Sequence, residues 1–168
     1  PVIFHMQNPR MPMSDQKAWR NLWYAGGPQQ IESALRQCPD TIFLGHGPGF
    51  WREISDAADS DTTNYPKTPC EPRGRLVRWL DEYPSLYGDL SAGSCLNALQ
   101  RQPDRGRAFL VRYADRMLFA RDCFDNALHD HLTSLRLPRP VWKKITSENA
   151  LRLVPLAPRR ASRRSARK

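Results

Sequence analysis

The chain has 168 residues, of which 40% are hydrophobic, and a formal net charge of +9 at pH 7. That length suits a single domain with a substantial core. No apolar run approaches the roughly 20 residues of a membrane span, and no secretory leader is evident, so we expect a cytoplasmic protein without a membrane partner. The four cysteines form no CxxC pair, which argues against a zinc ribbon or a redox motif.

Much of the positive charge lies at the carboxyl end of the chain. Six cationic side chains gather there without an acidic residue: Arg159, Arg160, Arg163, Arg164, Arg167 and Lys168. Without those six, the remaining net charge is +3. No aromatic residue lies between them, so base stacking has no platform and nucleic acid is a disfavoured partner. We expect a folded domain over 1–156 and a disordered basic tail over 157–168.

Four short apolar runs are typical of buried strands, because each is too short for a helix and is bounded by polar residues or turn formers. They cover residues 2–4, 41–44, 86–88 and 117–120. The second run leads into the glycine-rich turn that holds His46, where we expect regular structure to stop. The other three runs end at His5, at Asp89, and at Arg121 with Asp122.

Apolar residues at helical spacing alternate with these runs. The predicted helical segments are 19–23, 31–35, 76–80, 96–113 divided near Pro103, 128–135, and 147–153 with Ser147 as N-cap. A polar, proline-interrupted loop over 52–73 leaves the His46 turn, and a loop of this length is typical of a lid or substrate wall. The acidic residues in it, Asp56, Asp59 and Asp61, are expected to be solvated.

This alternation predicts an α/β fold of four βα units around a parallel sheet. In such sheets, ligands bind beyond the carboxyl ends of the strands, where His5, His46, Asp89 and Asp122 would meet. Two histidines with one or two carboxylates suit Zn²⁺, and also manganese or iron. A bound ion would activate water, and Asp122 is the best candidate to take its proton.

Two alternatives limit that hypothesis. The aspartates could instead cap the helices that follow them, with both histidines hydrogen-bonded inside loops. A second histidine pair, His129 and His131, has the spacing of a strand metal motif but falls in a predicted helix. There the two side chains point in different directions, so we expect a solvated helix surface.

Five motifs, taken in order, resemble the carboxyl-terminal half of the metal-dependent amidohydrolase superfamily: VIFH, FLGHGPGFW, LYGDLSAGS, RMLFARD and KKITSENALRLV. Members are TIM barrels and include hydrolases, lactonases and decarboxylases of the carboxymuconate-semialdehyde type. The resemblance implies four βα units that form the second half of a (β/α)8 barrel.

The resemblance also implies roles for individual residues. His5 would bind the metal, His46 would bind a second metal or polarise the substrate, and Asp122 would bind metal and act as general base. Asp89, Arg121 and Trp51 would lie on the substrate side, with Arg121 suited to an anionic substrate. Arg121 also departs from the family, which usually has serine or threonine before this aspartate.

The larger departure is that no strand of this chain carries the family's first-strand HxH pair. A full barrel needs about 250 residues, so we expect a fragment that needs its missing amino-terminal half or that forms a homo-oligomer. The leading predicted function is metal-dependent hydrolysis of an amide, ester or lactone in a small molecule. The alternatives are metal-dependent non-oxidative decarboxylation and, from another class, nucleic-acid binding through the basic tail.

Overall fold

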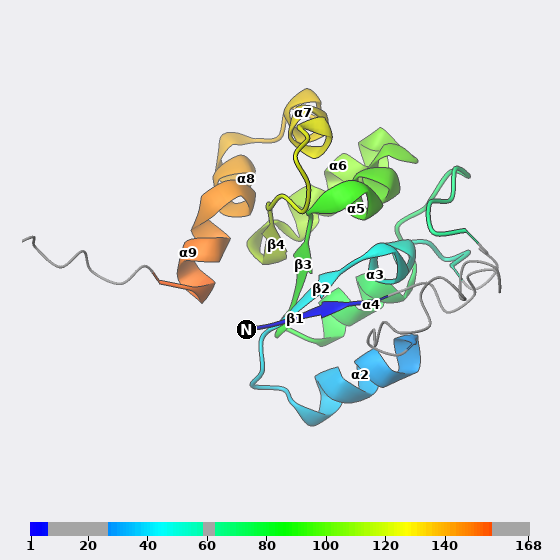
Figure 1. Ribbon diagram of the computed structural model, residues 1–168, viewed down its shortest axis with the longest axis vertical. Helices are drawn as coiled ribbons and strands as arrows, with labels where there is room; N and C mark the ends of the chain where they lie inside the picture. The colour runs from blue at the N-terminus through cyan, green and yellow to red at the C-terminus, as the bar shows by residue number, and fades with distance from the viewer. Residues whose placement is uncertain (7–26, 59–62, 156–168) are drawn as a thin grey trace, which may run out of the picture.

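The computed structural model describes residues 1–6, 27–58 and 63–155. Its centre is a four-stranded sheet in which every neighbouring pair is parallel, in the order β1-β2-β3-β4. The strands are β1 (Val2–His5), β2 (Phe43–His46), β3 (Leu86–Asp89) and β4 (Met117–Leu118). Because strand order follows chain order, each crossover joins neighbours in the sheet (Figure 1). The fold is α/β, and its alternating units are compatible with part of a TIM barrel.

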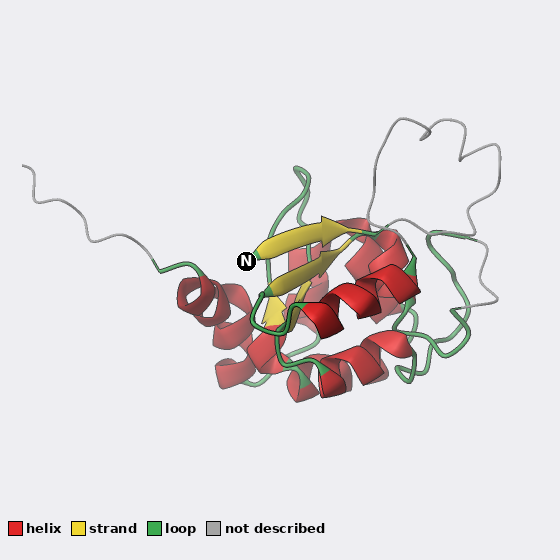
Figure 2. Cartoon of the chain, turned by 90° about the horizontal axis from the view of Figure 1, so that it is seen from below, coloured by secondary structure: helices red, strands yellow, loops and turns green. Residues whose placement is uncertain are grey.

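Helices fill the connections between the strands and follow the last strand. They are α2 (Pro28–Gln37), α3 (Pro48–Arg52), α4 (Arg75–Glu82), α5 (Ala92–Gln100), α6 (Pro103–Arg112), α7 (Ala127–Ser134), α8 (Arg139–Lys143) and α9 (Asn149–Leu153). A short 3-10 helix, η1 (Ala114–Arg116), precedes β4, and a π-helical turn, η2 (Lys144–Glu148), joins α8 to α9. Figure 2 shows the strands as one layer with the helices mainly on one side of it.

The helices pack on the sheet through the apolar stripes that the sequence predicts. In α2 the buried residues are Pro28, Ile31 and Leu35, which recur at helical spacing. Pro28 occupies the first turn, where its missing N–H costs no intrahelical hydrogen bond. In α4, Trp79 is fully buried in the same core.

Strand β2 differs from its prediction, because it runs from Phe43 through Gly45 to His46 rather than ending before the glycine. Gly45 is there for packing rather than to end the strand. A Cβ at this position would come within 2.2 Å of the Phe50 ring, so only glycine fits. Regular structure also resumes at once, since helix α3 begins at Pro48. His46 is therefore a strand residue, held more firmly than a turn residue.

Strand β4 and the last helical segment also differ from their predictions. Strand β4 stops at Leu118, because the next backbone N–H, that of Phe119, donates to the Ile145 carbonyl in η2 (2.9 Å). The predicted N-cap at Ser147 is wrong. Ser147 lies inside a continuous helical segment, where its hydroxyl donates to the Lys143 carbonyl (3.1 Å).

Several predictions fall outside the described residues: the helix over 19–23, Asp59 and Asp61 of the long loop, and the tail over 157–168. They stay predictions. Within the described ranges, no helix is long and apolar enough to cross a membrane.

An ion pair joins α2 to α4 on the outer helical layer. Glu32 accepts hydrogen bonds from both terminal nitrogens of Arg78 (2.8 and 2.9 Å) and from the indole of Trp79 (3.1 Å). The bond with Arg78 outweighs partial burial and lowers the pKa of Glu32 from its ordinary 4.5 to about 2. The Glu32 carboxylate therefore ties the two helices together throughout the neutral range.

We expect Glu32→Gln to lower the free energy of unfolding at pH 7 by about 1–2 kcal/mol, discounted because Arg78 is half exposed. The native pKa is depressed, so the stabilisation exists above pH 4.5 and disappears as the pH falls towards 2. Urea unfolding at several pH values should show the wild-type and variant curves converging in acid. The matched control, Glu82→Gln, removes only the more exposed bond to Arg78 (3.2 Å). A pH-independent difference would contradict this account.

Candidate active site

Two neighbouring strands bring a histidine and an aspartate together at the carboxyl end of the sheet. Gly45 of β2 pairs with Gly88 of β3, and the residues that follow are His46 and Asp89. His46 Nδ1 lies 3.1 Å from Asp89 Oδ2, and the two side chains are only 12% and 15% exposed. The carboxylate thus fixes the imidazole in a sheltered position.

Ser91, which is not among the predicted site residues, completes this arrangement. Its backbone N–H donates to Asp89 Oδ1 (2.9 Å), and its hydroxyl donates to Asp89 Oδ2 (2.9 Å). The same hydroxyl oxygen is 3.2 Å from His46 Nδ1. An aspartate two residues before a serine is a known turn signal, so DLS is the pattern that could have indicated this contact.

The pair perturbs the pKa of both members. The hydrogen bond to Asp89 raises the pKa of His46 above its ordinary value, against the opposing effect of burial, and the charge of Asp122 adds to the rise. For Asp89, burial acts to raise the pKa, but the bonds from His46 and Ser91 together outweigh it and lower the pKa. The geometry therefore favours a charged pair.

The second ring nitrogen of His46 faces the end of the fourth strand. Its Nε2 lies 4.0 Å from Asp122 Oδ2. Asp122 follows β4 in an open loop, and its side chain is 58% exposed. One imidazole therefore lies between two carboxylates: buried Asp89 on Nδ1 and accessible Asp122 near Nε2.

His5 lies on the other side of His46. The two are paired in the β1–β2 register, with ring centroids 5.1 Å apart and planes tilted by 56°. Gly47 passes close by with φ of 93°, a conformation that favours glycine. A Cβ on Gly47 would also meet the Met6 carbonyl oxygen at 2.9 Å and the His5 ring at 3.0 Å. The glycine is therefore needed for the two histidines to approach.

Trp51 does not lie open to a ligand, although the sequence placed it on the substrate side. It is 1% exposed and packs edge-on against Phe50 and Phe109. Its indole N–H donates to the Asp89 carbonyl (2.9 Å). The reason is α3, which turns Trp51 into the core, where it supports the backbone of Asp89.

Arg121 lies at the surface next to Asp122. Its guanidinium donates to the amide oxygen of Asn126 (2.7 Å). A neutral amide leaves the positive charge of Arg121 uncompensated at that contact. The other histidine pair lies on α7, as expected, but its surface is only partly solvated: His129 contacts the rings of Phe119 and Trp142, and burial lowers the pKa of His131.

These donors fit one side of a divalent-cation site. Two tetrahedral ligands at roughly 2.1 Å from one ion lie about 3.4 Å apart, so His46 Nε2 and Asp122 Oδ2, at 4.0 Å, would have to approach by a few tenths of an ångström, which the exposed loop of Asp122 permits. Asp89 on Nδ1 is the partner that metal-binding histidines commonly have. Across 1–6, 27–58 and 63–155, however, no group of three or more His, Cys, Asp or Glu side chains could hold an ion. Other ligands would have to come from outside these residues.

Comparison with known proteins gives little further guidance. No protein-family model and no curated protein matches the sequence. Among solved structures, the chain is similar to a dihydroxybenzoic acid decarboxylase from Polaromonas sp. JS666, crystallised with manganese and the inhibitor 2-nitroresorcinol. The identity is 22% and the TM-score 0.40, over 91% of this chain and 49% of that one. The chain thus spans about half the length of that structure, and the site itself must carry any assignment.

Proposed function

We propose that the chain supplies the histidine–carboxylate side of the active site of a metal-dependent hydrolase of the amidohydrolase type. The observation that carries this proposal is the double placement of His46. Its Nδ1 is held by Asp89 at 3.1 Å, while its Nε2 faces Asp122 at 4.0 Å. An imidazole held in this way offers one defined nitrogen to a metal ion or to a reacting oxygen.

His46 and Asp122 would hold the divalent cation, zinc in the first instance, with His5 beside them. When bound, such an ion lowers the pKa of its water to roughly 7 and polarises a carbonyl group. The exposed carboxylate of Asp122 is open to solvent and is placed to accept a proton. Asp89 and Ser91 keep the His46 ring in one orientation, and the His5 ring limits its rotation.

Decarboxylation of a small carboxylic acid at the same residues is the second candidate, and Arg121 favours it. Arg121 is next to Asp122 in the chain, and its guanidinium is hydrogen-bonded to the neutral amide of Asn126, with the Asp125 carboxylate close enough to feel its charge. Its guanidinium can therefore bind a substrate carboxylate with both terminal nitrogens. Hydrolysis of a neutral amide, ester or lactone has no use for that cation.

A partner is also part of this proposal. Val2 and Ile3 on strand β1 are 49% and 65% exposed, so the edge of the sheet presents apolar side chains. The other half of a barrel, or a second copy of the chain, would cover this edge and add ligands.

Metal content and product analysis of the full-length protein test the proposal. We expect about one zinc or manganese ion per chain, bound 10–100-fold more weakly after Asp89→Asn, which removes the carboxylate behind His46. The control is His129→Gln, which changes a histidine on α7 and should leave the affinity unchanged. Release of nitrophenol from a nitrophenyl ester would favour hydrolysis, and release of CO₂ from a dihydroxybenzoate would favour decarboxylation. Full activity in protein stripped of metal would contradict both.

A further inference from the structure

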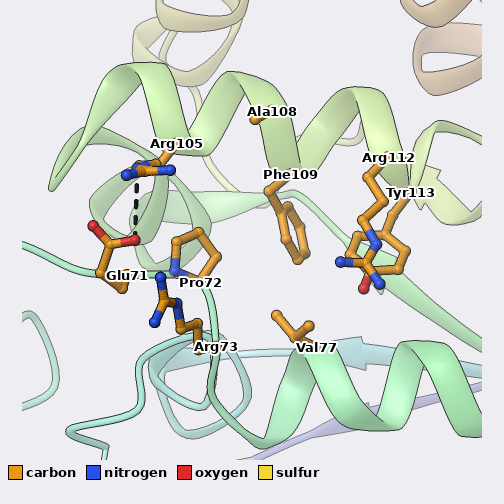
Figure 3. A pocket seen from close by; sticks show the side chains of 9 residues that line it. All are labelled: Glu71, Pro72, Arg73, Val77, Arg105, Ala108, Phe109, Arg112 and Tyr113. Atoms are coloured by element: carbon orange, nitrogen blue, oxygen red, sulfur yellow. Dashed lines mark ion pairs between the residues drawn. The ribbon is translucent and has the colours of Figure 1, made fainter.

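A cavity separate from the candidate active site lies between helices α4 and α6, within the outer helical layer (Figure 3). Its volume is about 220 Å³. None of the candidate active-site residues described above lines it. Helix α4 leads to β3 and α6 leads to β4, so both lie away from the β1 edge of the sheet. A partner that extends the sheet at β1 would therefore leave this cavity accessible.

The cavity combines an apolar interior with a cationic rim. Phe109, Val77 and Pro72 lie between its two ends, as Figure 3 shows. Arg73 and Arg105 stand at one end, and Arg112 stands with Tyr113 at the other. Pockets of this composition bind small molecules through apolar surface and orient them through a few polar groups.

The three arginines differ in how far their charges are compensated. Arg105 pairs with Glu71 at 3.6 Å. Arg112 pairs with Asp81 at 2.9 Å, and its guanidinium lies 5.0 Å from the centre of the Tyr113 ring.

Arg73 is different. Among the residues that the structure describes, no ion pair or side-chain hydrogen bond engages its guanidinium. The lining side chains include one acid, Glu71, against three arginines. Arg73 and Arg105 stand with Glu71 at the same end of the cavity, so that end carries a surplus of one positive charge.

We propose that this cavity binds a small anion with an apolar body: a carboxylate or phosphate group attached to a ring or a short hydrocarbon. The acidic group would lie at Arg73 and Arg105, since a guanidinium binds both kinds of anion through paired hydrogen bonds. The apolar body would lie against Phe109 and Val77. A volume of about 220 Å³ has room for a single-ring molecule such as benzoate.

Titration of the full-length protein with benzoate and with phenyl phosphate tests this inference, with binding followed by calorimetry and by NMR. We expect saturable binding with a Kd of about 1 mM, as for other ligands of this size. Benzyl alcohol, which has the ring without the charge, should bind at least about ten-fold more weakly, because it cannot form charge-assisted bonds. If benzoate alone or phenyl phosphate alone binds, the head group is thereby identified.

Variants locate the binding. Arg73→Gln should weaken it about ten-fold, because one charge-assisted contact is lost. Ala108→Phe, at an exposed lining position, should block the cavity while leaving the fold intact, as its thermal unfolding will show. Arg139→Gln, on α8 and away from the lining residues, is the matched control. His46→Gln should leave the affinity unchanged, which separates this site from the candidate active site. Failure of both anions to bind, or binding that survives Arg73→Gln and Ala108→Phe, would overturn the proposal.

Discussion

Replacing His46 with glutamine is expected to lower turnover of the full-length protein by more than about 10²-fold, because a metal ligand is lost and even the partner behind such a ligand is typically worth 10–100-fold. The reason is geometric. His46 is the one described side chain that contacts Asp89 through one ring nitrogen and approaches Asp122 with the other. Glutamine keeps a polar group of similar length but cannot ligate an ion or transfer a proton as imidazole does. Steady-state kinetics with whichever substrate proves active gives kcat and KM for both proteins.

Asp89→Asn separates positioning from direct participation. The amide keeps the shape of the side chain but loses the charge that favours protonated His46, so in metal-free protein the pKa of His46 should fall, and the pH profile of metal binding and turnover should move with it. We expect a smaller loss in kcat than for His46→Gln. Thr133→Ala, on the exposed face of α7, is a control for general effects of substitution. If Asp89→Asn lowers kcat no more than Thr133→Ala does and leaves the pH profile unchanged, Asp89 only stabilises the fold.

Replacing Asn149 with alanine is expected to cost about 2–4 kcal/mol of unfolding free energy, because two buried acceptors lose their donor. The Asn149 side chain is fully buried, and its amide nitrogen donates to the carbonyls of Ala114 (2.7 Å) and Met117 (2.8 Å). Ala114 is the first residue of η1, and Met117 is the first residue of β4. Asn149 therefore holds the strand that leads to Asp122.

Urea unfolding of Asn149→Ala beside Asn126→Ala measures this effect. Asn126 is exposed and makes no capping bond at the start of α7, so its loss should change stability by less than about 0.5 kcal/mol. If water satisfies the two carbonyls, the loss in Asn149→Ala will be below about 1 kcal/mol, and the structural role given to Asn149 will be wrong.

The alternation of strands and helices follows from local patterns along the chain. Apolar runs such as 86–88 and stripes such as Leu76, Trp79 and Leu80 are local patterns, and their period follows from backbone geometry alone. The sequence also placed His5, His46 and Asp89 at strand ends, since a polar residue that follows a short apolar run marks the end of burial.

Which of these residues interact depends on long-range packing rather than on local patterns. The sequence predicts Asp89 on the substrate side, whereas in the structure its carboxylate contacts His46 Nδ1. The reason is the β2–β3 register, which determines which strand ends are neighbours. Trp51 turned into the core because α3 forms directly after Gly47, whose left-handed backbone no apolar pattern reveals. Ser91 contacts a histidine 45 positions away, and Asn149 contacts carbonyls 32 and 35 positions away. Such contacts depend on parallel crossovers and close packing, so no local stretch of sequence encodes them.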